Sequence, residues 1–164
     1  MTPLLLIALL TLSPMGASSF SAKWRTFKGA YFEVKYPPNF KVRPSLPSES
    51  FEDKVDSVFF IAPDGSVQFY VFSPLWNGSP DDIERNPELE DVVSEDVEKK
   101  GSITTRRVTL RSKDKSYLRS FEDRENTETN NRTTFGIKYR DQAAYNKYRQ
   151  QYLTFKNSLR QFSD

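Results

Sequence analysis

The sequence predicts an α+β fold, namely a mostly antiparallel sheet of six to seven strands with helices on both faces (an α/β/α sandwich). Two central segments, residues 58–62 and 67–72, carry apolar side chains on both faces, which is typical of strands covered on both sides. The connection between them has hairpin length, which indicates antiparallel neighbours. A helical repeat of aromatic residues near the carboxyl end supplies one covering layer.

Four strands are expected in the first half of the chain, each bounded by turn residues. Residues 32–36 alternate apolar and charged side chains, and Pro37-Pro38-Asn39 ends this strand because proline cannot continue a ladder. Residues 40–42 resume the alternation before a polar loop at residues 44–52. The central pair is joined by Pro63-Asp64-Gly65-Ser66, in which Asp-Gly is a hairpin signal.

A first helix is expected over residues 86–100. Ser79 can cap a short turn that begins at Pro80, and Asn86 then caps a helix with Pro87 at its first position. Gly101 stands just past the end of this helix, which favours a helical stop. The apolar face of the helix would consist of Leu89, Val92, Val93 and Val97.

Three further strands and a closing helix follow, with strands expected at residues 103–110, 116–121 and 133–139. In the last strand the alternation points Phe135, Ile137 and Tyr139 inward, and Thr134, Lys138 and Arg140 outward. The entirely polar stretch 122–132 is expected to be a mobile loop. Asp141 caps the final helix. Along it, aromatic and apolar residues recur at spacings of three and four and form a stripe on one face: Tyr145, Tyr148, Tyr152, Phe155, Leu159 and Phe162. We interpret this stripe as core packing rather than as the wall of a ligand-binding site.

The amino terminus has the pattern of a secretory signal peptide. The first 22 residues contain no charged side chain, and a largely apolar run at residues 4–12 precedes Pro14, Gly16 and small residues. The run is too short to span a bilayer. We therefore expect residues 1–19 to be a signal peptide, with cleavage near Ser19 or Ser21, and residues 23–164 to form a single domain that is exported.

The absence of histidine and cysteine removes most catalytic chemistry. No disulfide framework, lipid anchor on cysteine or thiolate metal site is available, and Ser–His–Asp and Cys–His arrangements are excluded. The six glycines are scattered, so there is no phosphate-binding glycine loop. Aromatic residues make up 14% of the chain, which is enough for a substantial core. A protein that is not an enzyme is the expectation.

The net charge of +2 hides a strong asymmetry along the chain. Residues 81–98 carry 9 acidic and 1 basic side chains, whereas residues 99–164 carry 16 basic and 7 acidic ones. A basic carboxy-terminal half is compatible with nucleic-acid binding, but the secretory signal argues against nucleic acid as the partner. An acidic partner protein or an anionic membrane surface, with peripheral contact, fits better.

The carboxylate-rich stretch contains the best candidates for a metal site, Asp81 and Asp82, because Ca²⁺ or Mn²⁺ would take oxygen ligands. It lacks the ligand spacing and central glycine of an EF-hand loop. A solvated acidic face at a helix amino terminus, with Lys99 and Lys100 at the other end, explains the same charges through the helix dipole. We favour that interpretation and expect no cofactor.

Five residues are candidates for a binding surface: Trp76, Asn77, Arg106, Arg107 and Lys138. Trp76 lies in a loop directly after the central strand, where it can be an interface anchor or a lid on the core. Arg106 and Arg107 are adjacent in a strand, so one guanidinium points to each face; we expect one of them to be solvated and the other to need a partner. Lys138 is expected on the outward side of its strand.

The order of elements and three stretches of sequence resemble the PsbP family, which shares its fold with the Ran-binding protein Mog. These stretches are residues 32–40, 57–72 and 152–162. The resemblance implies export to the periplasm or thylakoid lumen and a role like that of PsbP, an extrinsic accessory subunit of photosystem II. Many bacterial members have no assigned activity. The chain departs from the family in lacking histidine, so a histidine-borne metal role is not implied.

Three functions remain open from the sequence. The first is an exported, monomeric, non-enzymatic accessory protein that binds a protein or membrane complex through a charged surface. The second is a small or amphipathic ligand bound between the carboxy-terminal helix and the sheet, against Tyr145, Tyr148 and Tyr152. The third is a carboxylate-dependent hydrolase, which requires two acidic residues converging in a cleft with raised pKa values.

Overall fold

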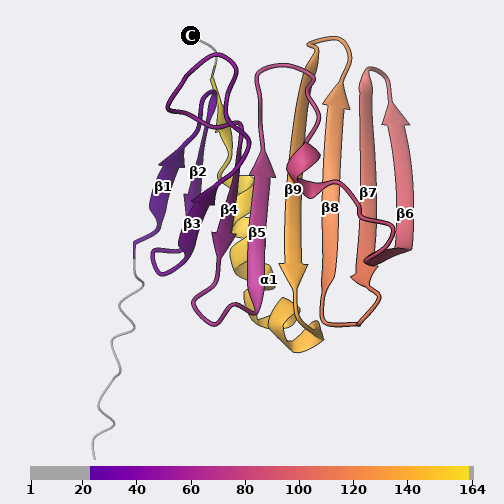
Figure 1. The fold of residues 1–164 in the computed structure, drawn as a ribbon. Helices are drawn as coiled ribbons and strands as arrows, with labels where there is room; N and C mark the ends of the chain where they lie inside the picture. The colour runs from indigo at the N-terminus through magenta and orange to yellow at the C-terminus, as the bar shows by residue number, and fades with distance from the viewer. Residues whose placement is uncertain (1–22, 163–164) are drawn as a thin grey trace, which may run out of the picture.

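The computed structural model describes residues 23–162, and among these it contains two β-sheets and one α-helix (Figure 1). The expected signal peptide, residues 1–19 with cleavage near Ser19 or Ser21, lies outside the described residues. The elements in chain order are β1 (Arg25–Lys28), β2 (Phe32–Tyr36), β3 (Lys41–Pro44), β4 (Ser57–Ile61), β5 (Val67–Phe72), the 3₁₀ turn η1 (Asp81–Ile83), β6 (Glu90–Lys100), β7 (Ile103–Ser112), β8 (Leu118–Asn126), β9 (Asn131–Tyr139), α1 (Gln142–Asn157) and β10 (Arg160–Gln161).

The main sheet has seven strands in the order β3-β4-β5-β9-β8-β7-β6, and every neighbouring pair is antiparallel. A second sheet, β1-β2-β10, joins the two ends of the described chain, because Glu33 of β2 lies opposite Arg160 of β10. The expectation of a mostly antiparallel sheet is therefore confirmed.

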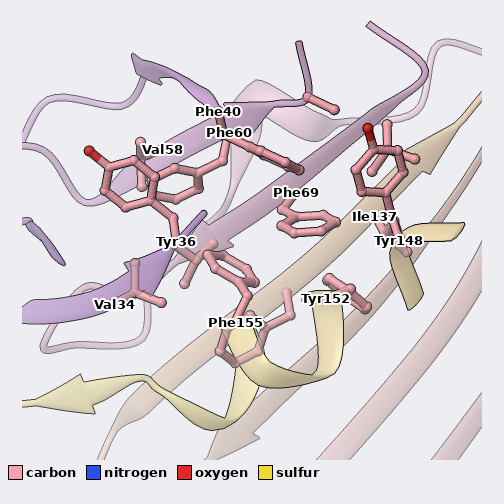
Figure 2. Close-up of a cluster of buried hydrophobic side chains, with 14 of the residues drawn as sticks. Val34, Tyr36, Phe40, Val58, Phe60, Phe69, Ile137, Tyr148, Tyr152 and Phe155 are labelled. Carbon is pink, nitrogen blue, oxygen red and sulfur yellow. The ribbon is translucent and has the colours of Figure 1, made fainter. Parts of the chain in front are cut away.

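The core lies between the main sheet on one side and α1 with the small sheet on the other (Figure 1). Figure 2 shows Tyr152 and Phe155 of α1 turned toward Phe60 and Phe69 of the central strands. Phe155 is fully buried, and its ring centroid lies 5.3 Å from that of Phe60 and 5.4 Å from that of Phe69. Aromatic packing of this kind is worth more than the buried area alone, and it anchors the helix.

The opposite face of the sheet is covered by residues 73–89, which we call the strap. The strap joins β5 to β6 and crosses in front of the sheet with η1 near its middle (Figure 1). Under it lies a second, smaller cluster of Phe59, Tyr70 and Phe72. Helices on both faces were expected; among residues 23–162 the only α-helix is α1, so that part of the prediction is wrong.

The expected helix over residues 86–100 is the long strand β6. Asn86 does start a single turn, since the amides of Leu89 and Glu90 donate to its carbonyl, but the turn does not continue. The β-branched valines favour an extended backbone that pairs with β7. Gly101, with φ of 59°, serves the β6–β7 hairpin turn rather than a helix end.

The prediction of a mobile loop at residues 122–132 is also wrong. β8 continues to Asn126, β9 begins at Asn131, and the two are joined by a short turn with Asn130 at φ of 47°. Polar side chains are compatible with strands here because both faces of this part of the sheet are partly open to solvent. Thr134, which was expected to point outward, lies on the strap face opposite Phe135. It is nevertheless buried there, and its hydroxyl donates to the Asp123 carboxylate.

The closing helix begins as expected, with the Asp141 side chain accepting from the amide of Ala144 at 2.8 Å. It ends earlier than the aromatic stripe, so Leu159 and Phe162 lie beyond it. The short turn expected at Pro80 is η1, although Pro80 rather than Ser79 stands at its start and no side chain caps it.

Replacement of Phe155 by alanine tests the core. We expect Phe155→Ala to lower the free energy of unfolding by about 3–5 kcal/mol, because it removes a fully buried ring from the sheet–helix contact. Phe162→Ala is the matched control, since Phe162 is exposed and should change stability by less than about 0.5 kcal/mol. Urea unfolding of both variants measures the difference, and equal losses would contradict this assignment of the core.

Candidate functional site

A buried ion pair fixes the strap to the sheet. Arg119 of β8 binds Glu90, the first residue of β6, through both carboxylate oxygens, with Nε to Oε1 and Nη2 to Oε2 each at 2.6 Å. The same guanidinium donates to the carbonyls of Ile83 (2.9 Å) and Glu84 (3.1 Å) in the strap. Glu90 is only 2% exposed. The pair therefore links strand β8, the strap and the start of β6.

Further hydrogen bonds surround this pair. The Tyr117 hydroxyl donates to Glu90 Oε1 at 2.9 Å, and Arg85 donates to the Glu90 carbonyl. Burial alone would raise the pKa of Glu90, but the hydrogen bonds from Arg119 and Tyr117 outweigh it and lower the pKa from its ordinary value. Glu90 is thus held as a carboxylate at neutral pH.

The middle of the strap is fixed by a second contact. Asp82 accepts hydrogen bonds from the Ser57 hydroxyl and the Tyr70 hydroxyl, both at 2.6 Å. Burial, followed by the neighbouring Asp82 carboxylate, raises the pKa of Tyr70, so this phenol stays protonated as a donor. Both Asp82 oxygens are engaged inside the protein.

Two hollows lie on the strap face, one on each side of Ile83 and Glu84. The first, which we call the cationic hollow, has a volume of about 270 Å³. It lies over β3, β4, β5, β9 and β8, and the strap forms its roof. The side chains that matter for its chemistry are Arg43, Gln68, Tyr117, Arg119 and Lys138.

The second hollow, which we call the strap groove, has a volume of about 480 Å³ and lies toward the free edge of the sheet. Val92, Val108, Leu110 and Phe121 contribute apolar surface to it. Its polar lining is of mixed charge and includes the ion pairs of Arg106 with Glu95 and of Arg132 with Asp123. The groove therefore suits a ligand that is apolar in part and charged in part.

Exposed apolar side chains are concentrated beside this groove. Among residues 23–162 the large hydrophobic residues that are exposed are Leu89 (59%), Val92 (44%), Val93 (46%), Val97 (59%) and Phe162 (38%). The first four lie in or directly before β6, the outermost strand of the main sheet. Four such residues on one edge mark a surface that is suited to contact.

The five predicted binding residues do not form one site. Arg106 and Arg107 lie on opposite faces of β7, as expected. Only one of them was expected to have a partner, but both do: Arg106 binds Glu95 at 2.7 Å, and Arg107 binds Glu122 at 3.1 Å. Lys138 lines the cationic hollow on the strap face, where it is half-buried rather than freely exposed.

Trp76 and Asn77 lie elsewhere in the strap. The Trp76 ring packs edge-on against Tyr31 with ring centroids 5.7 Å apart, so it contacts the turn between β1 and β2. The Asn77 amide donates to the Glu125 carboxylate near the end of β8. Lys138, on the neighbouring strand β9, lies opposite Arg119, near the beginning of β8. Trp76 and Asn77 therefore hold the first part of the strap, and they are distant from Lys138.

The metal candidates Asp81 and Asp82 both belong to η1. Asp81 is exposed, and Asp82 is bound by Ser57 and Tyr70 as described above. Among residues 23–162 no three or more acidic side chains converge in a way that would hold a metal ion. In the same part of the chain no helix is both long and apolar enough to cross a membrane.

A hollow also exists between α1 and the sheet, with a volume of about 330 Å³. Tyr145 and Tyr152 line it together with Ile137 and Tyr139, and Arg107, Glu122 and Lys156 supply charge. Tyr148 does not line it; its ring packs in the core against Phe40 and its hydroxyl donates to Asp64. The stripe is thus partly core and partly groove wall.

Sequence reasoning missed the residues that build the strap face, namely Glu90, Tyr117 and Arg119. Glu90 was one of many acidic residues in a stretch expected to be helical, and Arg119 lies 29 positions away from it. One signal was available, since Arg119 stands in the strand predicted at residues 116–121 and Lys138 in the one at residues 133–139. Two cations in strands of a covered sheet require partners.

Comparison with known proteins gives a fold but no close relative. No family model and no curated protein matches the sequence. The solution structure of cyanobacterial PsbP (CyanoP) from Synechocystis sp. PCC 6803 aligns with a TM-score of 0.51 at 10% identity, covering 92% of this chain and 100% of that one. The Saccharomyces cerevisiae Ran-binding protein Mog1p aligns with a TM-score of 0.40 at 10% identity, over 84% and 96% of the two chains. The chain has a PsbP-like fold, which confirms the resemblance at the level of fold.

Removal of the Arg119 guanidinium tests the anchor of the strap. We expect Arg119→Met to lower the free energy of unfolding by about 3–5 kcal/mol, because the Glu90 carboxylate stays buried without its partner. Arg111→Met, at an exposed arginine of the adjoining strand, is the control and should change little. If both variants unfold at the same denaturant concentration, the pair does not hold the strap.

The same pair predicts a pH dependence. The folded-state pKa of Glu90 lies below its ordinary value of 4.5, so its contribution to stability is complete above that pH and is lost as the pH falls through the folded pKa. We therefore expect the stability gap between the natural chain and Glu90→Gln to be constant above about pH 4.5 and to narrow below it. Denaturant unfolding between pH 3 and 7 measures this gap, and a gap that widens in acid would refute the expectation.

Proposed function

We propose that this chain is an exported, non-enzymatic accessory protein that binds a partner protein, alone or within a membrane complex, through the free edge of its main sheet. The contact surface consists of Leu89, β6 and the adjoining strap groove. The observation that carries the proposal is the concentration of exposed apolar side chains at Leu89, Val92, Val93 and Val97. A folded chain gains nothing from exposing these side chains together unless another molecule covers them.

The backbone of β6 supports the same surface. Within residues 23–162 its only paired neighbour in the main sheet is β7, so the N–H and C=O groups of its outer side are available to another strand. A bulge between Val92 and Ser94 interrupts the first half of the strand, whereas residues 94–100 keep a regular register. Natural edge strands are protected by short length, proline, bulges or charged side chains; β6 has a bulge and charged side chains, but it is 11 residues long and carries no proline.

Charge favours a partner segment that is basic as well as apolar. Residues 81–98 carry nine acidic side chains and one basic side chain, and they form both the strap wall of the groove and most of β6. Several of these carboxylates are already paired, including Glu90 and Glu95, but Asp81 and Glu84 line the groove without an ion-pair partner among residues 23–162. A basic residue beside an apolar one would satisfy both features.

Export and the absence of catalysis are proposed on other grounds. The sequence pattern of residues 1–22 supports export, and the lack of histidine and cysteine supports a binding role. The fold is that of a cyanobacterial PsbP, which agrees with a periplasmic or lumenal location. The charged residues Arg106, Arg107 and Lys138 would not act as a single patch, because Arg107 lies on the opposite face from the other two.

A second candidate function is supported by the hollow between α1 and the sheet. Its Tyr145 and Tyr152 walls and its charged neighbours Arg107 and Lys156 suit a small amphipathic molecule. Lys156 is already bound to Glu122 at 2.9 Å, and Arg107 to the same carboxylate. A ligand there would therefore compete with existing ion pairs, which is why we place this function second.

A substitution on β6 tests the proposed contact. We expect tagged full-length protein to recover its partner from gently solubilised native membranes, and Val97→Asp to reduce that recovery at least about tenfold by placing a charge in the apolar contact. The stability of the variant should change little, because Val97 is 59% exposed. Mass spectrometry of the bound proteins measures the recovery.

Thr26→Asp is the matched control, because Thr26 is also an exposed β-branched residue on an edge strand, β1. It should recover the partner as well as the natural chain does. Equal recovery by Val97→Asp and Thr26→Asp would exclude β6 as the contact surface. Recovery of the tagged protein alone would argue against a protein-binding role.

A further inference from the structure

A half-buried lysine without a carboxylate partner lies on the strap face. Lys138 sits between Gln68 of β5 and Arg119 of β8 in one row across the sheet. Its ammonium group lies 3.7 Å from the centroid of the Tyr117 ring, and no carboxylate of residues 23–162 forms an ion pair with it. A cation that has lost part of its hydration normally gains a partner in return.

The surroundings of Lys138 are cationic. Burial lowers the pKa of Lys138, and the neighbouring Arg119 and Arg43 lower it further, while Glu90 and Asp114 act in the opposite direction. Arg43 lies with its guanidinium 4.3 Å from the centroid of the Phe59 ring and likewise has no ion pair among residues 23–162. Three positive groups thus converge on one hollow of about 270 Å³.

Among residues 23–162, the carboxylates that line the hollow form no ion pair with Lys138 or Arg43. Both oxygens of Glu90 are bound by Arg119, and both oxygens of Asp82 accept from Ser57 and Tyr70. Glu84 is exposed, and its side chain forms no ion pair within residues 23–162. Lys138 and Arg43 are therefore the cations that remain available to a molecule entering the hollow.

We propose that the cationic hollow is a binding site for a small oxyanion, namely a carboxylate or phosphate group, held between Lys138 and Arg43. The planar Arg43 guanidinium offers paired N–H donors, the Lys138 ammonium offers a point charge, and the Gln68 amide lies beside Lys138 as a further donor. The Phe59 and Tyr117 rings hold the two cations in place from below. This site borders the proposed contact surface, because Leu89 and Glu84 also line the hollow, but its two available cations lie outside that surface and its anion binding does not depend on the proposed function.

A titration followed by NMR tests the site. Isotope-labelled full-length protein is titrated with sodium phosphate and, separately, with sodium acetate, at an ionic strength kept constant with sodium chloride. We expect resonances of Gln68, Lys138 and Arg43 to move along a saturable curve with at least one of the two anions. Saturation with phosphate alone assigns the site to phosphate groups, and saturation with acetate alone assigns it to carboxylates.

The double variant Arg43→Gln/Lys138→Gln should weaken that binding at least about tenfold, since both available cations are removed. Arg25→Gln/Lys28→Gln is the matched control, because it removes one arginine and one lysine from exposed positions of β1. It should bind as the natural chain does. Linear, unsaturated shifts with both anions, or equal weakening in the two double variants, would overturn the proposal.

Unfolding measurements separate loss of the site from loss of the fold. The Arg43→Gln/Lys138→Gln variant should be at least as stable as the natural chain without added anion, because it relieves repulsion among three converging cations. A variant that keeps its stability and loses the saturable shifts supports the site. A variant that keeps both its stability and the saturable shifts refutes the site.

Discussion

The strap face of this protein depends on the ion pair between Arg119 and Glu90. One guanidinium binds both carboxylate oxygens and two strap carbonyls, so it satisfies backbone groups that the strap cannot pair within itself. The same contact fixes where β6 begins and how far the strap stands above the sheet. Both hollows on this face, and the covering of Tyr70 and Phe59, follow from that position.

Much of the fold could be predicted from the sequence because its signals are local. The hairpin of β4 and β5 follows from an Asp-Gly turn between two apolar runs, and α1 follows from the Asp141 cap and the aromatic spacing. The prediction of a helix over residues 86–100 failed because the local signals of this segment conflict with its environment. Asn86, Pro87 and Gly101 are typical of helix ends, but pairing with ten residues of β7 decides the conformation instead.

The candidate site was predicted only in fragments, because it is built from residues far apart in the chain. The alternation within one strand placed Arg106 and Arg107 on opposite faces correctly, since that requires no knowledge of neighbouring strands. The surroundings of Lys138 could not be predicted in the same way. They depend on β5, β8 and β9 lying side by side and on a strap that crosses them, and nothing in the local pattern gives that order.

The small sheet has a consequence for how the chain acquires its structure. β2, near the beginning, pairs with β10, near the end, and β5 pairs with β9 across an intervening meander of three strands. Contacts of such long sequence separation form late, because closing a long loop costs entropy before the contact is made. During synthesis, the core around Phe155 therefore remains open until the chain as far as α1 has left the ribosome. Completion of the core is thus governed by α1 and β10 rather than by the first strands to emerge.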